Sequence, residues 1–265
     1  MRLEQLFPAA WPVIGVIHLL PLPGAPRFGG QMTPIFDHAL AELDALSRGG
    51  VDGVIVENFS DVPFYPARVP AETVAAIAAI TREVVTAARV PVGVNVLRND
   101  AAAAVAVATA TGAAFVRVNV HTGVVMSEQG LLVGASHETL RLRAALKSQV
   151  AIFADVGVKH AAPLAGRGLV SEAIDTAERG LADALIVSGD RTGSATAISD
   201  VTTVAEGVTL PVLVGSGATA DNVGAIMAHA DGVIVGTHLK RGGIVTEPVD
   251  PRRVTRFVAN ARDTG

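Results

Sequence analysis

Eight short runs of apolar residues recur along the chain, separated by longer stretches with helical character. Three runs begin with aspartate, three begin with proline, and two begin with neither. In chain order they cover residues 12–15, 52–56, 91–94, 115–118, 150–153, 183–187, 211–214 and 231–235. Runs that are apolar throughout are typical of parallel strands, because helices cover both faces of such a sheet. Eight strand–helix units in 265 residues predict the α/β class and one closed (β/α)8 barrel, a TIM barrel, spanning residues 1–265.

The ends of the helices between these runs are marked by capping residues. Thr33-Pro34 fits the start of a helix and Gly49-Gly50 fits its end. Proline suits the first turn of a helix, and glycine suits the left-handed position after the last turn. Asn99-Asp100 begins an alanine-rich helix that ends before Gly112. Further predicted helices begin near Ser136, Ser199, Thr219 and Asp250.

The connections differ in length at the two ends of the predicted barrel. Links from helix to strand are a few residues long, whereas five links from strand to helix are much longer. The long links are residues 18–31, 57–70, 121–135, 157–168 and 189–198. Long loops in a compact domain are usually functional, and barrel enzymes carry their sites at the carboxyl ends of the strands. We therefore expect a ligand site at this end, and contact between copies in a homo-oligomer is the alternative role of these loops.

Composition narrows the classes of function. The chain has 21 Lys and Arg against 25 Asp and Glu, a formal net charge of −4, which argues against a nucleic-acid-binding surface. It has no cysteine, which excludes disulfides, thiolate nucleophiles and cysteine-bound metals. No uncharged apolar run reaches about 20 residues, so no membrane span is expected. The first residues lack the pattern of a signal peptide, and we expect a cytoplasmic protein.

Two glycine clusters follow the last two predicted strands. Gly215-Ser216-Gly217 follows the seventh strand, and Gly236-Thr237 follows the eighth. Glycine lets the backbone approach a ligand and turn its N–H groups toward an anion. The loops after strands seven and eight form the phosphate site of many barrels. We therefore predict that Gly215, Ser216, Gly217, Gly236 and Thr237 bind a phosphate group of a small ligand.

Polar side chains end nearly every strand on the face that carries the long loops. They are His18, Glu57, Asn95, Arg117, Asn119, His121, Asp155, Lys159 and Ser188. Because side chains alternate along a strand, Asp155 and Lys159 share one face of the fifth strand. By the same rule Arg117, Asn119 and His121 share one face of the fourth. Buried charges are costly unless they are paired, so stability alone does not explain such a ring.

These residue types suggest two kinds of role. We predict that Asp155, Lys159, Glu57 and His121 are catalytic. Asp155 is a candidate general base or a partner that orients Lys159, and Lys159 would stabilise an oxyanion or form a Schiff base. Glu57 and His121 are candidate proton donors or acceptors. The predicted substrate-binding residues are His18, Asn95, Arg117, Asn119 and Ser188. An ion pair with Glu57 or Asp155 is the alternative role of Arg117.

The sequence requires no cofactor, but a divalent metal ion is an alternative. Glu57, Asp155, His18 and His121 include the oxygen and imidazole ligands that Zn²⁺, Mn²⁺ or Mg²⁺ take in proteins. The sequence has no helical His-x-x-x-His motif and no clustered carboxylate motif to support such a site. The metal ligands therefore stay unassigned.

Long sequence blocks around these residues resemble the BtpA family, also called BtpA/SgcQ. The matching blocks are residues 15–24, 56–64, 93–100, 117–123, 137–141, 154–160, 215–217, 235–237 and 248–251. Together they extend over nearly the whole chain. Two segments depart from the family pattern. Gly157 stands where a larger polar residue such as histidine is expected, and Ser188-Gly189-Asp190-Arg191-Thr192-Gly193 stands in place of Thr-Gly-x-x-Thr-Gly.

The resemblance implies a phosphate-binding TIM barrel, similar to the ribulose-phosphate-binding barrels. One cyanobacterial branch of the family is linked to photosystem I assembly or stability, and another branch sits among sugar-utilisation genes. Our first expectation is an enzyme of the lyase, isomerase or epimerase type that acts on a small phosphorylated metabolite, such as a sugar phosphate or nucleotide. The alternative is a non-enzymatic assembly or stability factor that binds a protein partner through residues 21–28 and 63–65.

Overall fold

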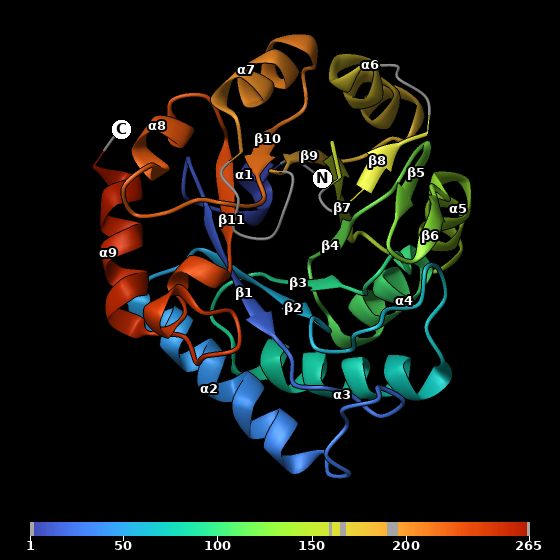
Figure 1. Ribbon diagram of the computed structural model, residues 1–265, viewed down its shortest axis with the longest axis vertical. Helices are drawn as coiled ribbons and strands as arrows, with labels where there is room; N and C mark the ends of the chain where they lie inside the picture. The colour runs from blue at the N-terminus through green and yellow to red at the C-terminus, as the bar shows by residue number, and fades with distance from the viewer. Residues whose placement is uncertain (1–2, 159–160, 165–167, 190–195, 264–265) are drawn as a thin grey trace.

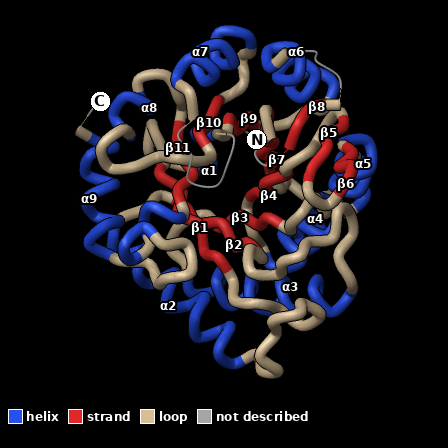
Figure 2. Tube along the Cα trace, viewed as in Figure 1, coloured by secondary structure: helices blue, strands red, loops and turns tan. Residues whose placement is uncertain are grey.

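Eight parallel strands close into a barrel in the computed structural model, which describes residues 3–158, 161–164, 168–189 and 196–263. In order around the barrel the strands are β1 (Val13–His18), β2 (Gly53–Glu57), β3 (Val92–Asn95), β4 (Phe115–Val118), β7 (Ala151–Val156), β9 (Ala184–Val187), β10 (Val212–Val214) and β11 (Gly232–Val235). Figure 2 shows them as an inner ring surrounded by helices. Each of the eight predicted runs contributes a strand, so the predicted (β/α)8 fold class is confirmed.

Helices cover the outside of this barrel and return the chain from the carboxyl end of one strand to the amino end of the next (Figure 1). They are α2 (Thr33–Gly49), α3 (Ala71–Ala87), α4 (Ala101–Thr111), α5 (Ser136–Ala145), α6 (Leu169–Ile174) with its π-helical continuation η1 (Asp175–Arg179), α7 (Ile198–Gly207), α8 (Val223–Met227) and α9 (Pro251–Arg262). Asp100 and Asp250 cap α4 and α9, because each carboxylate accepts a first-turn backbone N–H at 2.9 Å. None of the helices within the described ranges is long and apolar enough to cross a membrane.

Aromatic side chains fill the barrel at the amino ends of its strands. The short helix α1 (Leu3–Leu6) leads into Phe7, and the Phe7 ring lies 5.8 Å from the ring of Phe115. The Phe115 ring in turn stacks 4.8 Å from the ring of Phe153. All three rings belong to one buried cluster with the inward-facing residues of the strands. This packing closes the amino end of the barrel and directs the search for a ligand cavity to the opposite end.

A small antiparallel sheet forms from two of the segments that the sequence analysis treats as loops. It consists of β5 (Val124–Ser127), β6 (Gly130–Val133) and β8 (Ala161–Pro163), in the order β6-β5-β8. Figure 1 shows it beside α5 and α6. One face buries Val125 and Leu132 against the barrel. The opposite face exposes apolar side chains, with Met126 48% exposed and Val133 59% exposed.

Candidate functional site

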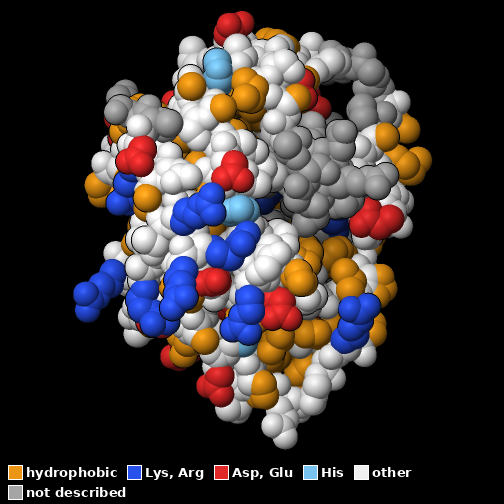
Figure 3. All heavy atoms as spheres, turned by 60° about the vertical axis from the view of Figure 1, so that its left-hand side comes forward, with side chains coloured by type: hydrophobic (Ala, Val, Ile, Leu, Met, Phe, Trp, Pro, Cys, Tyr) orange, Lys and Arg blue, Asp and Glu red, His pale blue; other side chains and the backbone are white. Residues whose placement is uncertain are grey.

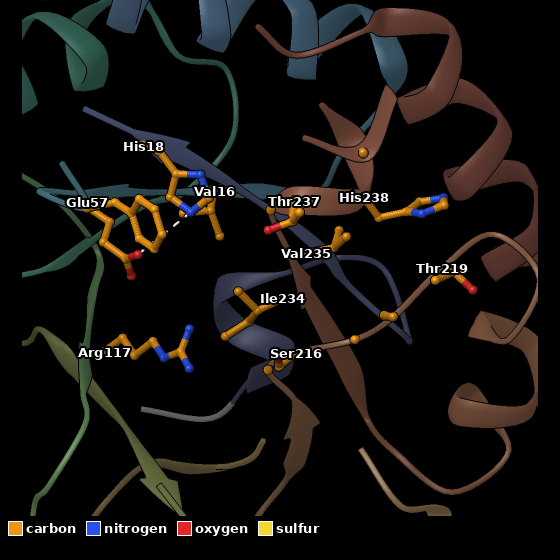
Figure 4. Close-up of a pocket in the computed structure, with 16 residues that line it drawn as sticks. Val16, His18, Glu57, Arg117, Ser216, Thr219, Ile234, Val235, Thr237 and His238 are labelled. Carbon is orange, nitrogen blue, oxygen red and sulfur yellow. Dashed lines mark ion pairs between the residues drawn. The ribbon is translucent and has the colours of Figure 1, made fainter. Parts of the chain in front are cut away.

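A cavity of about 460 Å³ lies at the carboxyl ends of the strands. β1 and β2 contribute His18 and Glu57, β4 contributes Arg117, and the loops after β10 and β11 contribute residues 215–219 and 236–238. Figure 4 shows the arrangement, with His18 and Glu57 on one side and Thr219 and His238 on the other. The guanidinium of Arg117 points into the space between them, toward Ser216. The cavity therefore brings the predicted phosphate segments and part of the predicted polar ring to one place.

Two backbone segments, residues 215–219 and 236–238, line one wall of the cavity. Among the described residues, the N–H groups of Gly217, Ala218, Gly236 and Thr237 have no hydrogen-bond partner. The loop that carries the first two is fixed by Asn222, whose Oδ1 accepts the Thr219 N–H at 2.7 Å and whose Nδ2 donates to the Gly217 carbonyl at 3.0 Å. Unpaired N–H groups on a rigid loop form a cradle for an anion. We call the segments 215–219 and 236–237 the cradle.

Two glycines let the cradle approach the polar side chains closely. A Cβ at Gly236 would lie 2.8 Å from Cε1 of His18, and a Cβ at Gly215 would lie 2.9 Å from Oγ of Ser188. The Gly215 Cβ would also lie 3.2 Å from Nη2 of Arg117. Any larger residue at these two positions would displace side chains of the polar ring. Glycine is therefore required here by the contact between the two walls of the cavity.

Arg117 and Asp155 form a buried ion pair behind the cavity wall. Nε of Arg117 donates to Oδ1 of Asp155 at 3.1 Å, and Nη2 donates to Oδ2 at 3.0 Å. Asn119 adds a bond from Nδ2 to the same Oδ2 at 2.7 Å, and Arg117 also reaches Ser188 Oγ at 3.4 Å. Burial disfavours the charge of Arg117, but attraction by Asp155 and Glu57 outweighs it and raises the Arg117 pKa. The guanidinium therefore stays charged while it lines the cavity.

Glu57 provides a carboxylate on the opposite side of the cavity. Its Oε2 accepts a hydrogen bond from Asn95 Nδ2 at 2.6 Å, and its Oε1 lies 3.7 Å from Nε2 of His18. The His18 ring in turn packs on Phe59, with 4.5 Å between the ring centroids. Glu57 and His18 are both buried within the protein yet line the cavity. Such a carboxylate, oriented by one amide and next to an imidazole, can take up or release a proton.

The structure thus divides the predicted site residues into three groups. Residues that line the cavity are His18, Glu57, Arg117, Gly215, Ser216, Gly217, Gly236 and Thr237. Residues that lie behind these, bonded to a lining residue directly or through Asp155, are Asn95, Asn119, Asp155 and Ser188. His121 belongs to neither group, and Lys159 lies outside the described residues.

His121 points away from the cavity. Its Nε2 donates to the Gly180 carbonyl at 2.8 Å, at the end of η1. Burial lowers the pKa of this ring, which keeps it neutral. The alternation that placed His121 beside Arg117 holds only within a strand, and β4 ends at Val118. The chain changes direction after this point, so residue 121 does not continue the inward-facing series.

Phe59, His238 and Gly243 are among the lining residues that were not predicted from the sequence. His238 accepts the N–H of Ala220 on Nε2 at 3.1 Å and so links the loops after β10 and β11. It directly follows the predicted Gly236-Thr237 segment, and extension of that segment by one residue would have included it. Phe59 comes two residues after the end of β2 and carries no polar signal of its own.

The candidate metal ligands do not converge. His18 and Glu57 are neighbours, but Asp155 is bonded to Arg117 and His121 is bonded to Gly180. Within the described part of the chain, no three side chains of His, Cys, Asp or Glu form a group that could hold a metal ion. Among these residues there is therefore no metal centre to which a reaction step could be assigned.

A family model described as the BtpA family matches residues 9–263. This chain belongs to the BtpA family. Photosystem I biogenesis protein BtpA of Synechocystis sp. is 50% identical over 261 residues, which is 97% of this chain and 90% of that protein. An uncharacterized protein of Pyrococcus abyssi is 42% identical over 246 residues, 93% of this chain and 94% of that protein. The family resemblance predicted from the sequence blocks is thereby confirmed.

Solved structures with the same fold are far less similar in sequence. N-(5'-phosphoribosyl)anthranilate isomerase from Pyrococcus furiosus aligns with a TM-score of 0.58 at 17% identity, over 96% of this chain and 99% of that chain. Tryptophan synthase from Mycobacterium tuberculosis aligns with a TM-score of 0.64 at 18% identity, over 96% and 93%. At this level of identity the likeness shows that the BtpA-family chain shares the TIM-barrel fold with these enzymes, and no more.

Proposed function

We propose that this BtpA-family protein is an enzyme that acts on a small phosphorylated metabolite, a sugar phosphate or a nucleotide, as a lyase, isomerase or epimerase. One observation carries the proposal. The cradle and a carboxylate, Glu57, lie on opposite sides of one cavity, which a charged guanidinium, Arg117, also lines. A phosphate anchor opposite an acid–base group is what such a reaction needs.

The cradle would bind the phosphate group. Its N–H groups come from Gly217 and Ala218 on one loop and from Gly236 and Thr237 on the other, and all four residues line the same cavity. The hydroxyls of Ser216 and Thr237 supply further donors. Hydrogen bonds to a charged acceptor are roughly twice as strong as bonds between neutral groups. This wall would hold the substrate, so that its reacting carbon atoms extend toward Glu57.

Glu57 is the residue that would move the proton. Asn95 holds one of its oxygens, and the other faces His18, so the carboxylate has a fixed direction. A general base placed in this way contributes about 10²–10⁴-fold to the rate. Arg117 would stabilise the negative charge that develops on a substrate oxygen when the proton leaves carbon. Asp155 already accepts bonds from Arg117 and Asn119, so we assign it to positioning Arg117.

A thermal-shift screen of phosphorylated sugars and nucleotides, with and without divalent cations, tests the proposal. A ligand at 100 times its Kd should stabilise the protein by about 2.7 kcal/mol. With a substrate in hand, Glu57→Gln should bind it as the wild type does and lose about 10²–10⁴-fold in turnover. Wild-type turnover in this variant, or no stabilisation by any phosphorylated compound, would contradict the proposal.

The printed name of the Synechocystis relative supports a second candidate, a non-enzymatic assembly or stability factor. A further cavity of about 320 Å³, lined in part by Pro26, Phe64 and Tyr65, lies among the loops after β1 and β2. These are the loops expected to bind a protein partner. Capture of one defined partner that is lost on Tyr65→Ala, combined with no response to phosphorylated ligands, would favour this function over the enzymatic one.

A further inference from the structure

Arg253 of α9 lies against the outer margin of the cavity. Its Nε donates to the carbonyl of His238 at 2.7 Å, which fixes the direction of the guanidinium. Its Nη2 lies 3.4 Å from Nδ1 of His238 and would lie 3.6 Å from a Cβ placed on Gly243. His238 and Gly243 both line the cavity. The guanidinium is therefore held in place next to the cavity, beyond the cradle.

Two N–H donors point at the two ring nitrogens of His238, but a neutral ring can accept only one of them. Ala220 N–H points at Nε2 at 3.1 Å, and Arg253 Nη2 points at Nδ1 at 3.4 Å. Burial and the charge of Arg253 lower the pKa of the ring, so it is neutral. A neutral imidazole has a single acceptor nitrogen and one N–H of its own. With Nε2 accepting from Ala220, the ring proton lies on Nδ1 and faces the Arg253 donor, so this side of the ring lacks an acceptor that an anion next to Arg253 would supply.

The charge distribution on this face agrees with an anionic ligand. The chain carries a net charge of −4, yet α9 has four arginines and no acidic residue. Figure 3 shows Lys and Arg side chains gathered around a histidine on the face that bears α2, α8 and α9. Arg256 and Arg262 are each in an ion pair with an aspartate. Arg253 has no ion pair with a carboxylate in the described part of the chain.

We infer that the cavity is built for a diphosphate, with one phosphate in the cradle and the next at Arg253 and His238. The inference rests on the proposed function, because it takes the cradle to be a phosphate site. A guanidinium offers a planar pair of donors that matches two phosphate oxygens. A cavity of about 460 Å³ is within the range of small-molecule sites and exceeds the needs of a single phosphate. Together with Arg253, this places a diphosphate ester as the ligand class that uses both groups of donors.

Isothermal titration with inorganic phosphate and inorganic pyrophosphate, at one fixed ionic strength, tests the inference. The wild type should bind pyrophosphate at least about tenfold more tightly than phosphate, as expected for added charged hydrogen bonds. Arg253→Met should remove that preference and leave the affinity for phosphate within about twofold. Arg252→Met is the matched control, because Arg252 is the exposed neighbour on the same helix. It removes the same charge and should keep the preference.

The outcomes separate this inference from the proposed function. Equal affinity of the wild type for the two anions, or equal losses in Arg253→Met and Arg252→Met, would overturn the diphosphate site and leave the cradle standing. Failure of the wild type to bind either anion would overturn the cradle itself. If Arg253→Met does not fold, Arg253→Lys replaces it, since lysine keeps the charge and loses the planar pair of donors. A full wild-type preference in Arg253→Lys would also overturn the inference.

Discussion

Arg117 and Asp155 are each 3% exposed, and each compensates the charge of the other. Buried ion pairs of this kind seldom stabilise a protein relative to apolar residues of the same volume, because both charges lose their hydration. The pair is nevertheless built with three donors on one carboxylate, from Arg117 and Asn119. A role in the cavity, where Arg117 presents its charge, accounts for the pair better than stability does.

Replacement of Arg117 or Asp155 alone should destabilise the protein much more than replacement of both residues together. Arg117→Met leaves the Asp155 carboxylate buried without its cation, and the free energy of unfolding should fall by about 3–5 kcal/mol. The double variant Arg117→Met/Asp155→Leu should recover most of this loss, because no buried charge remains. Urea denaturation of the wild type, both single variants and the double variant measures the coupling. Additive losses in the double variant would show that the pair does not act as a unit.

Gly236 is a second position where a small substitution should alter the cavity, because even one added methyl group contacts His18. Gly236→Ala places a Cβ 2.8 Å from Cε1 of His18, so the His18 ring must shift and its contact with Glu57 must change. The strain of such overpacking costs about 1–3 kcal/mol, and affinity for inorganic phosphate should fall because the cradle shifts as well. Gly29→Ala is the control, since a Cβ there meets nothing within 4 Å. Equal melting temperatures and phosphate affinities for the two variants would contradict this account.

At this scale the sequence predicted which polar residues meet, because the barrel brings all strand ends to one rim. Strand alternation placed Arg117 and Asn119 on one face of their strand, and in the structure both donate to Asp155. Alternation does not tell how deeply each residue is buried. It therefore could not show that Asp155 is paired with Arg117 behind the cavity wall, whereas Glu57 lines the cavity. The roles of the individual residues depend on side-chain contacts that no spacing rule contains.

At the scale of the elements, the strands of the barrel were predictable because helices cover one face and the barrel interior the other. Their sequences are apolar except for single polar residues toward the carboxyl ends of β1, β2, β3, β4 and β7, and this pattern is distinct. The sheet of β5, β6 and β8 gave no comparable signal. Its strands are three or four residues long, and β8 follows β5 by more than 30 positions. Their pairing depends on the proximity of two barrel loops, which exists only once the barrel has closed.

α1 is another element that the sequence did not predict, since four residues are too few for a periodic pattern. Its function is to bring Phe7, which is 1% exposed, into the amino end of the barrel. Phe7→Ala should lower the free energy of unfolding by about 3–5 kcal/mol, because the cavity left behind is closed in by strand side chains. Urea denaturation measures the loss, and phosphate titration should remain as in the wild type.

Trp11→Ala provides the comparison for Phe7→Ala, because Trp11 is also a large aromatic residue of the N-terminal segment but is 44% exposed. Its loss in stability should be clearly smaller. A similar loss in both variants would mean that Phe7 does not fill the barrel. A change in phosphate affinity in Phe7→Ala would mean that the two ends of the barrel are coupled.

At the scale of the whole molecule, the two ends of the barrel have separate tasks. The amino end is closed by an aromatic cluster, and the carboxyl end carries the cavity and the long loops. This division is general in barrels, where residues at the carboxyl ends serve catalysis and those at the amino ends serve stability. Residues outside the cavity can therefore change the free energy of unfolding of the whole barrel. His121 is one such residue.

The pH dependence of unfolding should report on His121. Burial lowers its folded-state pKa below the usual 6.5, and its Nδ1 is buried without a partner among the described residues. Below pH 6.5 the unfolded chain binds a proton at this ring while the folded protein does not. The free energy of unfolding should therefore fall as the pH drops from about 6.5 toward the folded pKa, and this ring should add no slope above 6.5.

His121→Gln tests this assignment, because the glutamine amide can still donate to the Gly180 carbonyl but does not titrate. Its free energy of unfolding should decline less than that of the wild type between pH 6.5 and pH 5, as measured by urea denaturation at a series of pH values. The pKa of His238 is lowered as well, so part of the decline should remain in the variant. His137→Gln removes an exposed imidazole and controls for the loss of a histidine. Parallel curves for the wild type and His121→Gln would show that His121 is not held neutral by the fold.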